Sequence, residues 1–584
     1  MRLYLHHSGE VRAESKFEEK DILKGAGFQW HKYEKYWWTP DITIALPLIE
    51  YADEQLRAAI AAHQQRSAQA IVASRAVAAQ VEVPAPEGLV YMPHQLAAIA
   101  YSGERVGALN ADEMGLGKTI SALGVINSDQ SIKKVVVVCP AMLKINWARE
   151  AKKWLARPFR IIVVNGGKLS PDELTGQDSV LVIINYEVLG KHQTLLNSIA
   201  WDLVVLDEAH YCKNYKAART KLATQLLARG RRRLALTGTP VLAAPQDLVE
   251  ILMALDPKHW SDRFAYLRRY CGFMETTYGW ACTDPANLSE LQEKLRGTVM
   301  VRRLKSDVLT DLPPKMRQVI VLEQSSRELR AQVMLEKKTL RQHHVARAAA
   351  KSRAAEARRT GNEQAYRDAV NRLREIGRVA LEDISRLRQE TALLKLPYVI
   401  EYLQNNLEQT ANKKVVVFAH HVAILKKLQQ AFPDNSVLVY GDIPFQARQA
   451  AIDRFQADRA CQVFIAGIRA ASLGITLTAA SHVVFAELDW TPACMKQAED
   501  RLHRIGQLNP ITIQQVVVDD SIDARIAKVL LRKQAIIDKC LDVDANVVTA
   551  TDEEDTGLLD ELLAEQSDNP DQADISRQGV DVAA

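Results

Sequence analysis

The stretch VGALNADEMGLGKT, residues 106–119, decides the fold class of this 584-residue chain. A short apolar run enters a glycine-rich turn, and Lys118 and Thr119 then open a segment that is expected to be a helix. A strand, a glycine loop and a helix in this order are typical of a phosphate-binding loop, because backbone N–H groups at the helix start can surround phosphate oxygens. We therefore predict a nucleotide-binding α/β domain; a glycine turn that only caps a helix is the alternative.

The side chains of this loop suit a nucleotide and its cation. Gly115 and Gly117 leave room for phosphates, Lys118 is expected to neutralise the outer phosphate charges, and the Thr119 hydroxyl can ligate Mg²⁺. Asp112 departs from the usual pattern, because it stands where the first glycine of G-x-x-x-x-G-K-T is expected.

Four apolar strands are predicted downstream, alternating with helices: Val135–Val138, Leu181–Ile184, Leu203–Leu206 and Leu234–Leu236. Continuous apolar strands of this kind indicate a parallel sheet covered on both faces. Functional groups then belong at the carboxyl ends of the strands. Asp207 and Glu208 follow the third strand, where Asp207 is expected to hold Mg²⁺ and Glu208 to deprotonate an attacking water. A solvated acidic loop is the alternative.

Two further polar segments fit this domain. Thr237–Thr239 follows the fourth strand and is a candidate relay between the phosphates and strand movement, with a simple turn as the alternative. Gln95 lies upstream of the loop, and its amide both donates and accepts, so it is able to read the edge of an adenine base.

A second α/β domain is predicted from about Leu396, with strands at 413–418, 462–469 and 483–485 and a strand and turn at 437–442. It has no phosphate loop. Instead Arg501 and Arg504 lie three residues apart on a predicted helix, which would place both on one face. Two guanidinium groups can complete a phosphate site across a cleft; a helix that carries only surface ion pairs is the alternative.

The N-terminal 45 residues are rich in aromatic side chains. The segment 28–40 contains three of the nine tryptophans, interleaved with His31, Lys32 and Lys35. Aromatic rings beside cations can stack on bases and pair with phosphates. A domain this small also needs large rings to build a core. Both explanations are kept, since different rings can serve different roles.

Charge is distributed unevenly along the chain. Between Lys337 and Arg388 there are fourteen basic and six acidic residues in a helix-forming composition, which fits contact with a duplex backbone or a solvated helical hairpin. From Asp552 to Asp581 there are eleven acidic residues and one basic residue. We expect this tail to be disordered and to aid solubility; competition with DNA for the basic surface and binding of a protein partner are the alternatives.

Composition narrows the class of protein further. Apolar residues make up 47% and charged residues 25%, as in ordinary globular proteins. We expect neither a signal peptide nor a membrane span. The seven cysteines have no C-x-x-C spacing, which favours buried thiols in a reducing cytosol over a zinc site.

Together these segments resemble the Swi/Snf family of superfamily-two helicase-like DNA translocases, over about residues 90–540. The matching motifs occur in the family's order: Gln95, Asp112–Thr119, Asp207–His210, Leu236–Pro240, Arg302–Lys315, Ala466–Thr478 and Gln497–Gln507. Asp112 is what that family carries in its phosphate loop. Arg388–Thr391 and Phe485–Pro492 look like the HARP-bearing annealing-helicase branch, and residues 27–38 are reminiscent of its HARP module.

The resemblance implies two RecA-like parallel-sheet domains in tandem, with helical protrusions and a small N-terminal α+β module. The expected divisions are a HARP-like module at 1–45, a helix and linker at 46–88, the ATP-binding domain at 89–320 with a protrusion at 245–300, a basic helical insertion at 321–392, the second RecA-like domain at 393–545, and an acidic tail at 546–584.

The resemblance also implies function. ATP and Mg²⁺ are the expected cofactors, with Arg501 and Arg504 completing the site. Double-stranded or forked DNA is the expected partner, contacted by Lys144, Asn185, Tyr186, His420, His421 and Arg469. We expect a monomer that tracks along duplex DNA in the bacterial or phage-infected cytoplasm, or in the nucleus of a eukaryote. A strand-separating helicase and an ATP-gated DNA-binding scaffold are the alternatives.

Overall fold

The computed structural model describes residues 1–164, 169–171, 174, 179–241, 244–276, 279–282, 285–309, 311–409, 414–471, 475–504 and 506–541. The chain divides into two compact units. The first comprises residues 1–240, 247–266 and 289–308, and the second comprises residues 241–246, 267–288 and the chain from residue 309. One division therefore falls inside the matching motif Arg302–Lys315, which its two prolines predict to be a rigid strap. The predicted acidic tail, Ile505 and residues 472–474 of one predicted motif lie outside the described residues.

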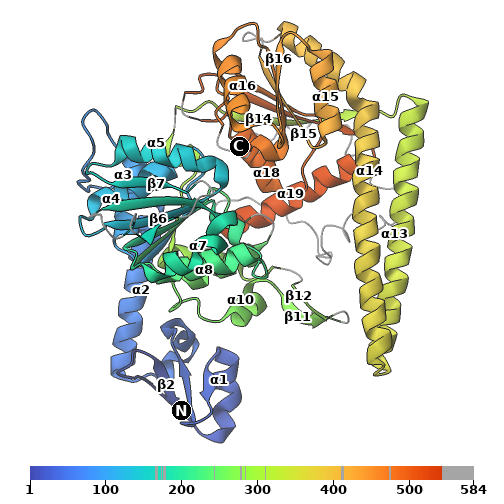
Figure 1. Cartoon of the computed structure of the whole chain (residues 1–584). Coiled ribbons are helices and arrows are strands. Elements are labelled where there is room, and N and C mark those ends of the chain that lie inside the picture. Colours follow the sequence, from blue (N-terminus) through green and yellow to red (C-terminus); the bar gives the residue numbers. More distant parts are fainter. Residues whose placement is uncertain are drawn as a thin grey trace. The chain divides into compact units, whose positions relative to one another are not determined.

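The first unit is built on a parallel sheet (Figure 1). In the described residues its strand order is β13 (Met300–Val301), β5 (Gly107–Asn110), β10 (Arg232–Leu236), β9 (Leu203–Asp207), β6 (Lys134–Cys139), β8 (Val180–Asn185) and β7 (Arg160–Val163). All six pairings are parallel, which confirms the sheet predicted from the apolar strands. The side chains of β6, β8 and β9 are almost entirely buried, because helices cover both faces.

The helices and short 3₁₀ turns of this unit connect the strands. They are α3 (Pro93–Gly103), α4 (Lys118–Ser128), η3 (Ala141–Leu143), α5 (Lys144–Trp154), η4 (Tyr186–Val188), α7 (Leu189–Ser198), η5 (Ala209–Cys212), α8 (Ala218–Arg229), η6 (Pro245–Leu248), α9 (Val249–Leu255), α11 (Leu288–Thr298) and α12 (Lys305–Val308). Because every strand runs the same way, the segments that follow their carboxyl ends gather along one edge of the sheet.

The N-terminal module has its own antiparallel sheet, in the order β1 (Arg2–Leu5), β2 (Val11–Glu14), β4 (Tyr36–Thr39) and β3 (Gln29–His31). It also contains η1 (Phe17–Glu19), α1 (Lys20–Ala26) and η2 (Ile42–Tyr51), and α2 (Glu54–Arg75) follows. Leu56 and Ile60 of α2 belong to the same apolar core as the module.

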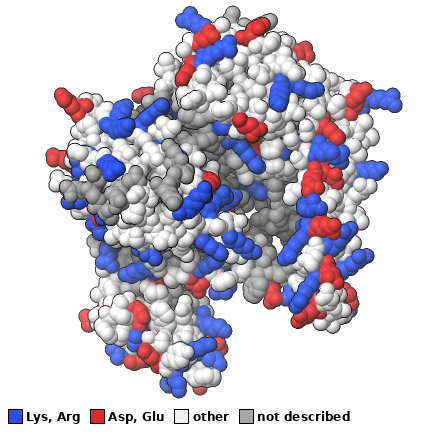
Figure 2. Space-filling view, in the orientation of Figure 1, with Lys and Arg blue, Asp and Glu red and all other residues white. Residues whose placement is uncertain are grey.

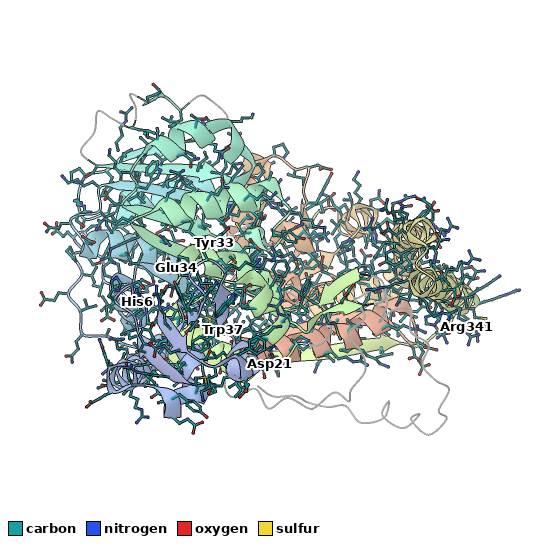
Figure 3. All side chains as sticks on the ribbon, turned by 90° about the horizontal axis from the view of Figure 1, so that it is seen from below. His6, Asp21, Tyr33, Glu34, Trp37 and Arg341 are labelled. Carbon is teal, nitrogen blue, oxygen red and sulfur yellow. The ribbon has the colours of Figure 1, made fainter. Side chains whose placement is uncertain are left out.

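The aromatic rings of this module divide between two environments. Phe28 is buried and Trp37, labelled in Figure 3, packs against the core. Trp30 is 47% exposed and Tyr33 is 93% exposed. Beside them His31 stacks on Tyr36, with ring centroids 5.0 Å apart. Core packing and an exposed aromatic surface therefore involve different rings.

The second unit contains another parallel sheet, with the described order β14 (Lys315–Leu322), β19 (Ile511–Val518), β18 (His482–Phe485), β15 (Val415–Ala419), β17 (Val463–Gly467) and β16 (Ser436–Val439). Its helices include α15 (Val422–Ala431), α16 (Phe445–Ala457), α17 (Ile468–Ala471), α18 (Pro492–Glu499) and α19 (Ile522–Leu541). The predicted strands are β15 to β18, and β14 and β19 extend the sheet beyond the prediction.

Two long helices, α13 (Arg327–Arg359) and α14 (Glu363–Gln409), pack along each other as a hairpin (Figure 1). Acidic and basic side chains alternate along its surface (Figure 2). Arginines 359, 367, 372, 378 and 386 pair with carboxylates three or four residues away on their own helix. Arg341, labelled in Figure 3, is exposed. Much of the basic charge is thus balanced locally, as the solvated-hairpin interpretation expects.

The segment 245–300 departs from its purely helical prediction. After α10 (Arg263–Tyr270) it forms a small antiparallel pair, β11 (Phe273–Thr276) and β12 (Gly279–Cys282). Arg358 at the end of α13 forms an ion pair with Glu275 of β11. This pair of four-residue strands was not predicted from the sequence.

A buried carboxylate lies where α13, α14 and α19 meet. Glu336 is 1% exposed; it accepts hydrogen bonds from the Thr391 hydroxyl and, at 2.8 Å, from the backbone N–H of Ile522. Burial raises the pKa of Glu336 from 4.5 to about 7, and the charge of Asp523 adds to this shift. The neutral form is therefore favoured in the folded state.

We expect the unfolding free energy to fall as pH rises towards and through 7, because Glu336 must then ionise inside the fold. A Glu336→Gln variant keeps the neutral shape and should gain stability relative to the parent between pH 5 and pH 7, by on the order of 2 kcal/mol. Urea unfolding of both proteins at the two pH values measures this difference. The same difference in unfolding free energy between variant and parent at both pH values would contradict the prediction.

None of the described helices combines the length and the apolar character needed to cross a lipid bilayer.

Candidate functional site

The predicted phosphate loop joins β5 to α4. Gly117 precedes the helix with φ +81°, a backbone conformation that favours glycine, and a Cβ atom there would lie 2.3 Å from the end of the flexible Gln95 side chain. Lys118 Nζ donates to the carbonyl oxygens of Asp112, at 2.8 Å, and Glu113, at 3.3 Å. Thr119 lies in the first turn of α4, where backbone N–H groups are not used within the helix. The loop thus presents an ammonium group and a helix N-terminus together.

Gln95 supports this loop from α3. Its Oε1 accepts from the backbone N–H of Met92 at 3.0 Å, and its Nε2 donates to the carbonyl oxygen of Leu116 at 3.4 Å. His94 contacts the same carbonyl oxygen through Nε2 at 2.9 Å. The structure therefore joins Gln95 to the phosphate loop, and recognition of adenine by its amide stays a prediction.

Asp112 is buried in an ion pair with Arg303, a residue of the predicted strap. Its Oδ1 accepts from the Arg303 backbone N–H at 3.0 Å and from Nε at 2.8 Å, while Oδ2 accepts from Nη2. Arg303 Nη1 donates to the carbonyl oxygens of His94, at 2.6 Å, and Ala76, at 3.2 Å. Asp112 thus anchors the phosphate loop to the segment that leads out of the first unit.

The acidic pair lies at the end of β9. Asp207 Oδ2 accepts from Trp147 Nε1 at 2.7 Å, and Asp207 Oδ1 accepts from the backbone N–H of Glu208 at 2.9 Å. Burial, followed by the charge of Glu208, raises the pKa of Asp207 to about 6, while Lys118 acts in the opposite direction. A bound divalent cation would relieve this crowding of negative charge.

Glu208 has a strained backbone. Its φ of 49° and ψ of 52° place a residue that has a Cβ atom in the left-handed region. Its Oε2 lies 3.3 Å from His210 Nδ1, which is 3.1 Å from the Thr237 hydroxyl. Gly238 follows, where a Cβ atom would lie 2.3 Å from Met114 Cγ and 3.1 Å from Lys118 Nζ. These contacts join the acidic pair, the predicted relay and the phosphate loop in one site.

The donor set fits a nucleotide with Mg²⁺. An ammonium group and a helix N-terminus suit phosphate oxygens, and a hydroxyl with a buried carboxylate suits a hard cation. The tight approaches at Gly117 and Gly238 keep side chains out of the loop.

The predicted helix that carries Arg501 and Arg504 is wrong. Helix α18 ends at Glu499, whose carboxylate accepts from Arg317 Nη2 at 2.7 Å, and Asp500 accepts from Lys315 Nζ at 2.5 Å. Carboxylates oppose the negative end of a helix dipole, which favours termination there. The following residues form turns, so the two arginines do not share a helix face.

The two arginines differ in exposure. Arg501 is 1% exposed, whereas Arg504 is half-buried and donates through Nη1 to the Thr476 hydroxyl at 3.0 Å. His503 contacts the carbonyl oxygen of Pro313, in the predicted strap, at 2.9 Å. Both arginines belong to the second unit, and their role towards a nucleotide stays a prediction.

Three of the predicted DNA contacts lie in the first unit, and all are buried. Lys144 Nζ donates to the carbonyl oxygen of Val164 at 2.7 Å. Asn185 Nδ2 donates to Glu187 at 2.7 Å, and the Tyr186 hydroxyl donates to the carbonyl oxygen of Asp207 at 2.9 Å. Contact of Lys144 or Tyr186 with DNA would require a local rearrangement.

The other three lie in the second unit and reach solvent. The Arg469 side chain is 71% exposed, and His420 and His421 are half-buried at the start of α15. These three are better placed to meet a polyanion.

Several residues that contact the predicted nucleotide-binding residues were not identified from the sequence. Trp147 gave no signal, since an apolar position on a helix is ordinary, and Arg303 lay in the strap without an assigned partner. His210 was within the matched motif and could have been assigned.

Tandem parallel-sheet domains, with a phosphate loop and an acidic pair in the first, define a helicase-like nucleotide-binding protein of RecA-like architecture. The SNF2-related domain model matches residues 30–375, more than half of the chain, and the helicase conserved C-terminal domain model matches residues 396–506. The chain belongs to the SNF2-related family.

Two curated relatives are similar to this chain over most of its length. The "DNA annealing helicase and endonuclease ZRANB3" of Mus musculus is 33% identical over 487 residues, which is 80% of this chain and 42% of the relative. The "SWI/SNF-related matrix-associated actin-dependent regulator of chromatin subfamily A-like protein 1" of Xenopus tropicalis is 30% identical over 480 residues, 81% of this chain and 47% of the relative. The chain thus spans less than half the length of these relatives. The solved SWI2/SNF2 ATPase core of Sulfolobus solfataricus with dsDNA is 19% identical, covering 80% of this chain and 100% of its own, with a TM-score of 0.37.

Proposed function

We propose that this protein is a DNA-dependent ATPase that translocates along double-stranded or forked DNA and remodels branched DNA or displaces bound proteins. The observation that carries the proposal is the adjacent carboxylates of buried Asp207 and partly buried Glu208 beside Lys118, in a member of the SNF2-related family. A relative named as a DNA annealing helicase supports DNA as the substrate and strand annealing as an associated activity.

In this proposal the residues of the first unit perform hydrolysis. Lys118 exchanges its loop carbonyl partners for phosphate oxygens. Thr119 and Asp207 hold Mg²⁺, which when bound supplies charge neutralisation at the phosphates. Glu208 orients a water molecule and removes its proton, and His210 holds the Glu208 carboxylate. Arg501 and Arg504 contribute positive charge towards the transferred phosphate.

DNA-dependent ATP turnover tests the proposal directly. Purified protein should hydrolyse ATP faster with duplex or forked DNA than with single-stranded DNA or none, and it should displace the third strand from a triplex. Unwinding of a short forked duplex without triplex displacement would instead favour a strand-separating helicase. DNA binding that responds to ATP but shows no turnover would favour an ATP-gated scaffold and would overturn the motor assignment.

The exposed rings of the N-terminal module provide a sharper test than removal of residues 1–45. That deletion would strip the core on which α2 packs. A Trp30→Ala/Tyr33→Ala variant should keep the core and lose base stacking, which is worth about 1–3 kcal/mol per base.

We expect the fork-over-duplex preference in DNA-stimulated turnover to fall by roughly tenfold in this variant. A Phe17→Ala variant, which removes another exposed ring of the module, is the control. An unchanged preference in the double variant would contradict a substrate-selecting role for these rings.

A further inference from the structure

Two sequence segments that resemble the annealing-helicase branch, about 100 residues apart, meet in the second unit. Arg388 of α14 is buried, and its Nη2 donates to the carbonyl oxygen of Leu488. The same guanidinium lies 4.7 Å from the centre of the Trp490 ring. Its Nε is 3.4 Å from Asp523, which also pairs with Lys395 at 2.6 Å. The long hairpin is thus fastened to the loop that follows β18.

This loop carries two buried carboxylates, Glu487 and Asp489, which we call the carboxylate platform. Glu487 Oε2 accepts from the backbone N–H groups of His420, at 3.0 Å, and His421, at 2.9 Å. Glu487 Oε1 is 2.6 Å from His421 Nδ1. The N-terminus of α15 is therefore occupied by a carboxylate of the chain itself, which leaves the side chains, rather than these two amides, to meet an external anion.

Asp489 completes the platform. Its Oδ2 lies 3.3 Å from Arg469 Nε and 3.7 Å from His420 Nδ1. Its Oδ1 accepts from the backbone N–H of Thr491, at 3.1 Å, and from the Thr491 hydroxyl, at 3.0 Å. Both oxygens have defined partners, so the carboxylate has little freedom to rotate.

The platform remains negatively charged at neutral pH. Burial acts to raise the pKa of both carboxylates, but it is outweighed for Glu487 by the hydrogen bonds and the charge of His421 acting together, and for Asp489 by His420, the charge of Arg469 and the hydrogen bond from Thr491 acting together. Each side chain of the platform is 1% exposed, whereas the Arg469 side chain above it is 71% exposed. These buried anions thus hold the exposed Arg469 guanidinium and the two histidine side chains at the surface.

We propose that Arg388, Glu487 and Asp489 are positioning residues that hold His420, His421 and Arg469 for contact with a DNA phosphate, so that Arg388 couples the α13–α14 hairpin to that contact. This rests on the proposed function, because DNA is taken as the bound polyanion. The buried bonds of Arg388 transmit displacement of α14 to the carbonyl between the two carboxylates, since buried polar networks are stiff and expensive to break. Ser385, one turn earlier on α14, lies 3.4 Å from His421 Nε2 and adds a second link.

The test uses the full chain with Arg388→Lys, Glu487→Gln and Asp489→Asn. For each, ATP turnover is measured against the concentration of a duplex oligonucleotide, and binding of the fluorescently labelled duplex is measured directly. We expect the half-saturating DNA concentration to rise by roughly tenfold, with a smaller change in the maximal turnover. An Asp458→Asn variant, which like Glu487→Gln and Asp489→Asn removes one negative charge but from an exposed ion pair with Arg454, should leave the half-saturating concentration unchanged.

A purely structural role would lower the unfolding temperature and the maximal turnover together and leave the half-saturating DNA concentration unchanged, and that result would overturn the inference. If Arg388→Lys fails to fold, Asp489→Asn decides, because asparagine keeps the shape of the side chain and the acceptor for Thr491. Absence of DNA stimulation in the parent protein would instead overturn the proposed function.

Discussion

Replacement of Glu208 by glutamine is expected to reduce DNA-stimulated ATP turnover by about a thousandfold. Glutamine has nearly the same shape, and it keeps an oxygen that can face His210, but it cannot accept a proton from water. The left-handed backbone at φ 49° orients this side chain. Steady-state ATP hydrolysis with saturating duplex DNA measures the loss.

The matched control is Glu104→Gln, which makes the same chemical change in the first unit at a side chain that is 74% exposed. Its turnover should equal that of the parent. Nucleotide binding by Glu208→Gln should persist, because the phosphate loop is unchanged. Turnover of the variant within tenfold of the parent would remove Glu208 from the proposed chemistry.

Replacement of Asp112 by asparagine is expected to lower the unfolding free energy by about 3–5 kcal/mol. Arg303 would remain buried with its charge uncompensated, and the new amide group would place donors against the Nη2 or Nε donors of the guanidinium. The phosphate loop would also lose its anchor, so nucleotide affinity should fall as well. Urea unfolding followed by tryptophan fluorescence measures the stability change.

An Asp129→Asn variant provides the comparison. Asp129 pairs with Arg232 at 3.1 Å, but both side chains are partly exposed, and such pairs contribute less than about 1 kcal/mol. Equal destabilisation by the two substitutions would show that Asp112 and Arg303 are not specially coupled.

The Asp112–Arg303 contact is an example of an interaction that could not be predicted from the sequence. The phosphate loop was predicted from fourteen consecutive residues, and Asp112 was seen there as a departure from the usual pattern. Its partner lies 191 residues further along the chain, on the segment that follows β13. The contact exists because β13 pairs with β5, which no local pattern records.

For Arg501 and Arg504 the sequence predicted a structural feature, a shared helix, that the fold does not contain. Spacing of three residues favoured a shared helix face, but the ion pairs of Glu499 and Asp500 with β14 accompany an earlier end to the helix. Local periodicity was thus overridden by tertiary contacts. The family resemblance likewise implied DNA contacts at Lys144 and Tyr186, and the fold buries both side chains.

The sequence by itself determined the two parallel sheets, the phosphate loop, the acidic pair at the end of β9 and membership of the SNF2-related family. These features depend on apolar periodicity and on short motifs, and both are patterns of residues that are close together in the sequence. Only the tertiary structure decided which side chains meet across long stretches of chain, as Asp112 meets Arg303 and Arg388 meets Leu488. Such pairs depend on the order of strands in a sheet and on helix packing, which satisfy buried charges from residues that are remote in sequence.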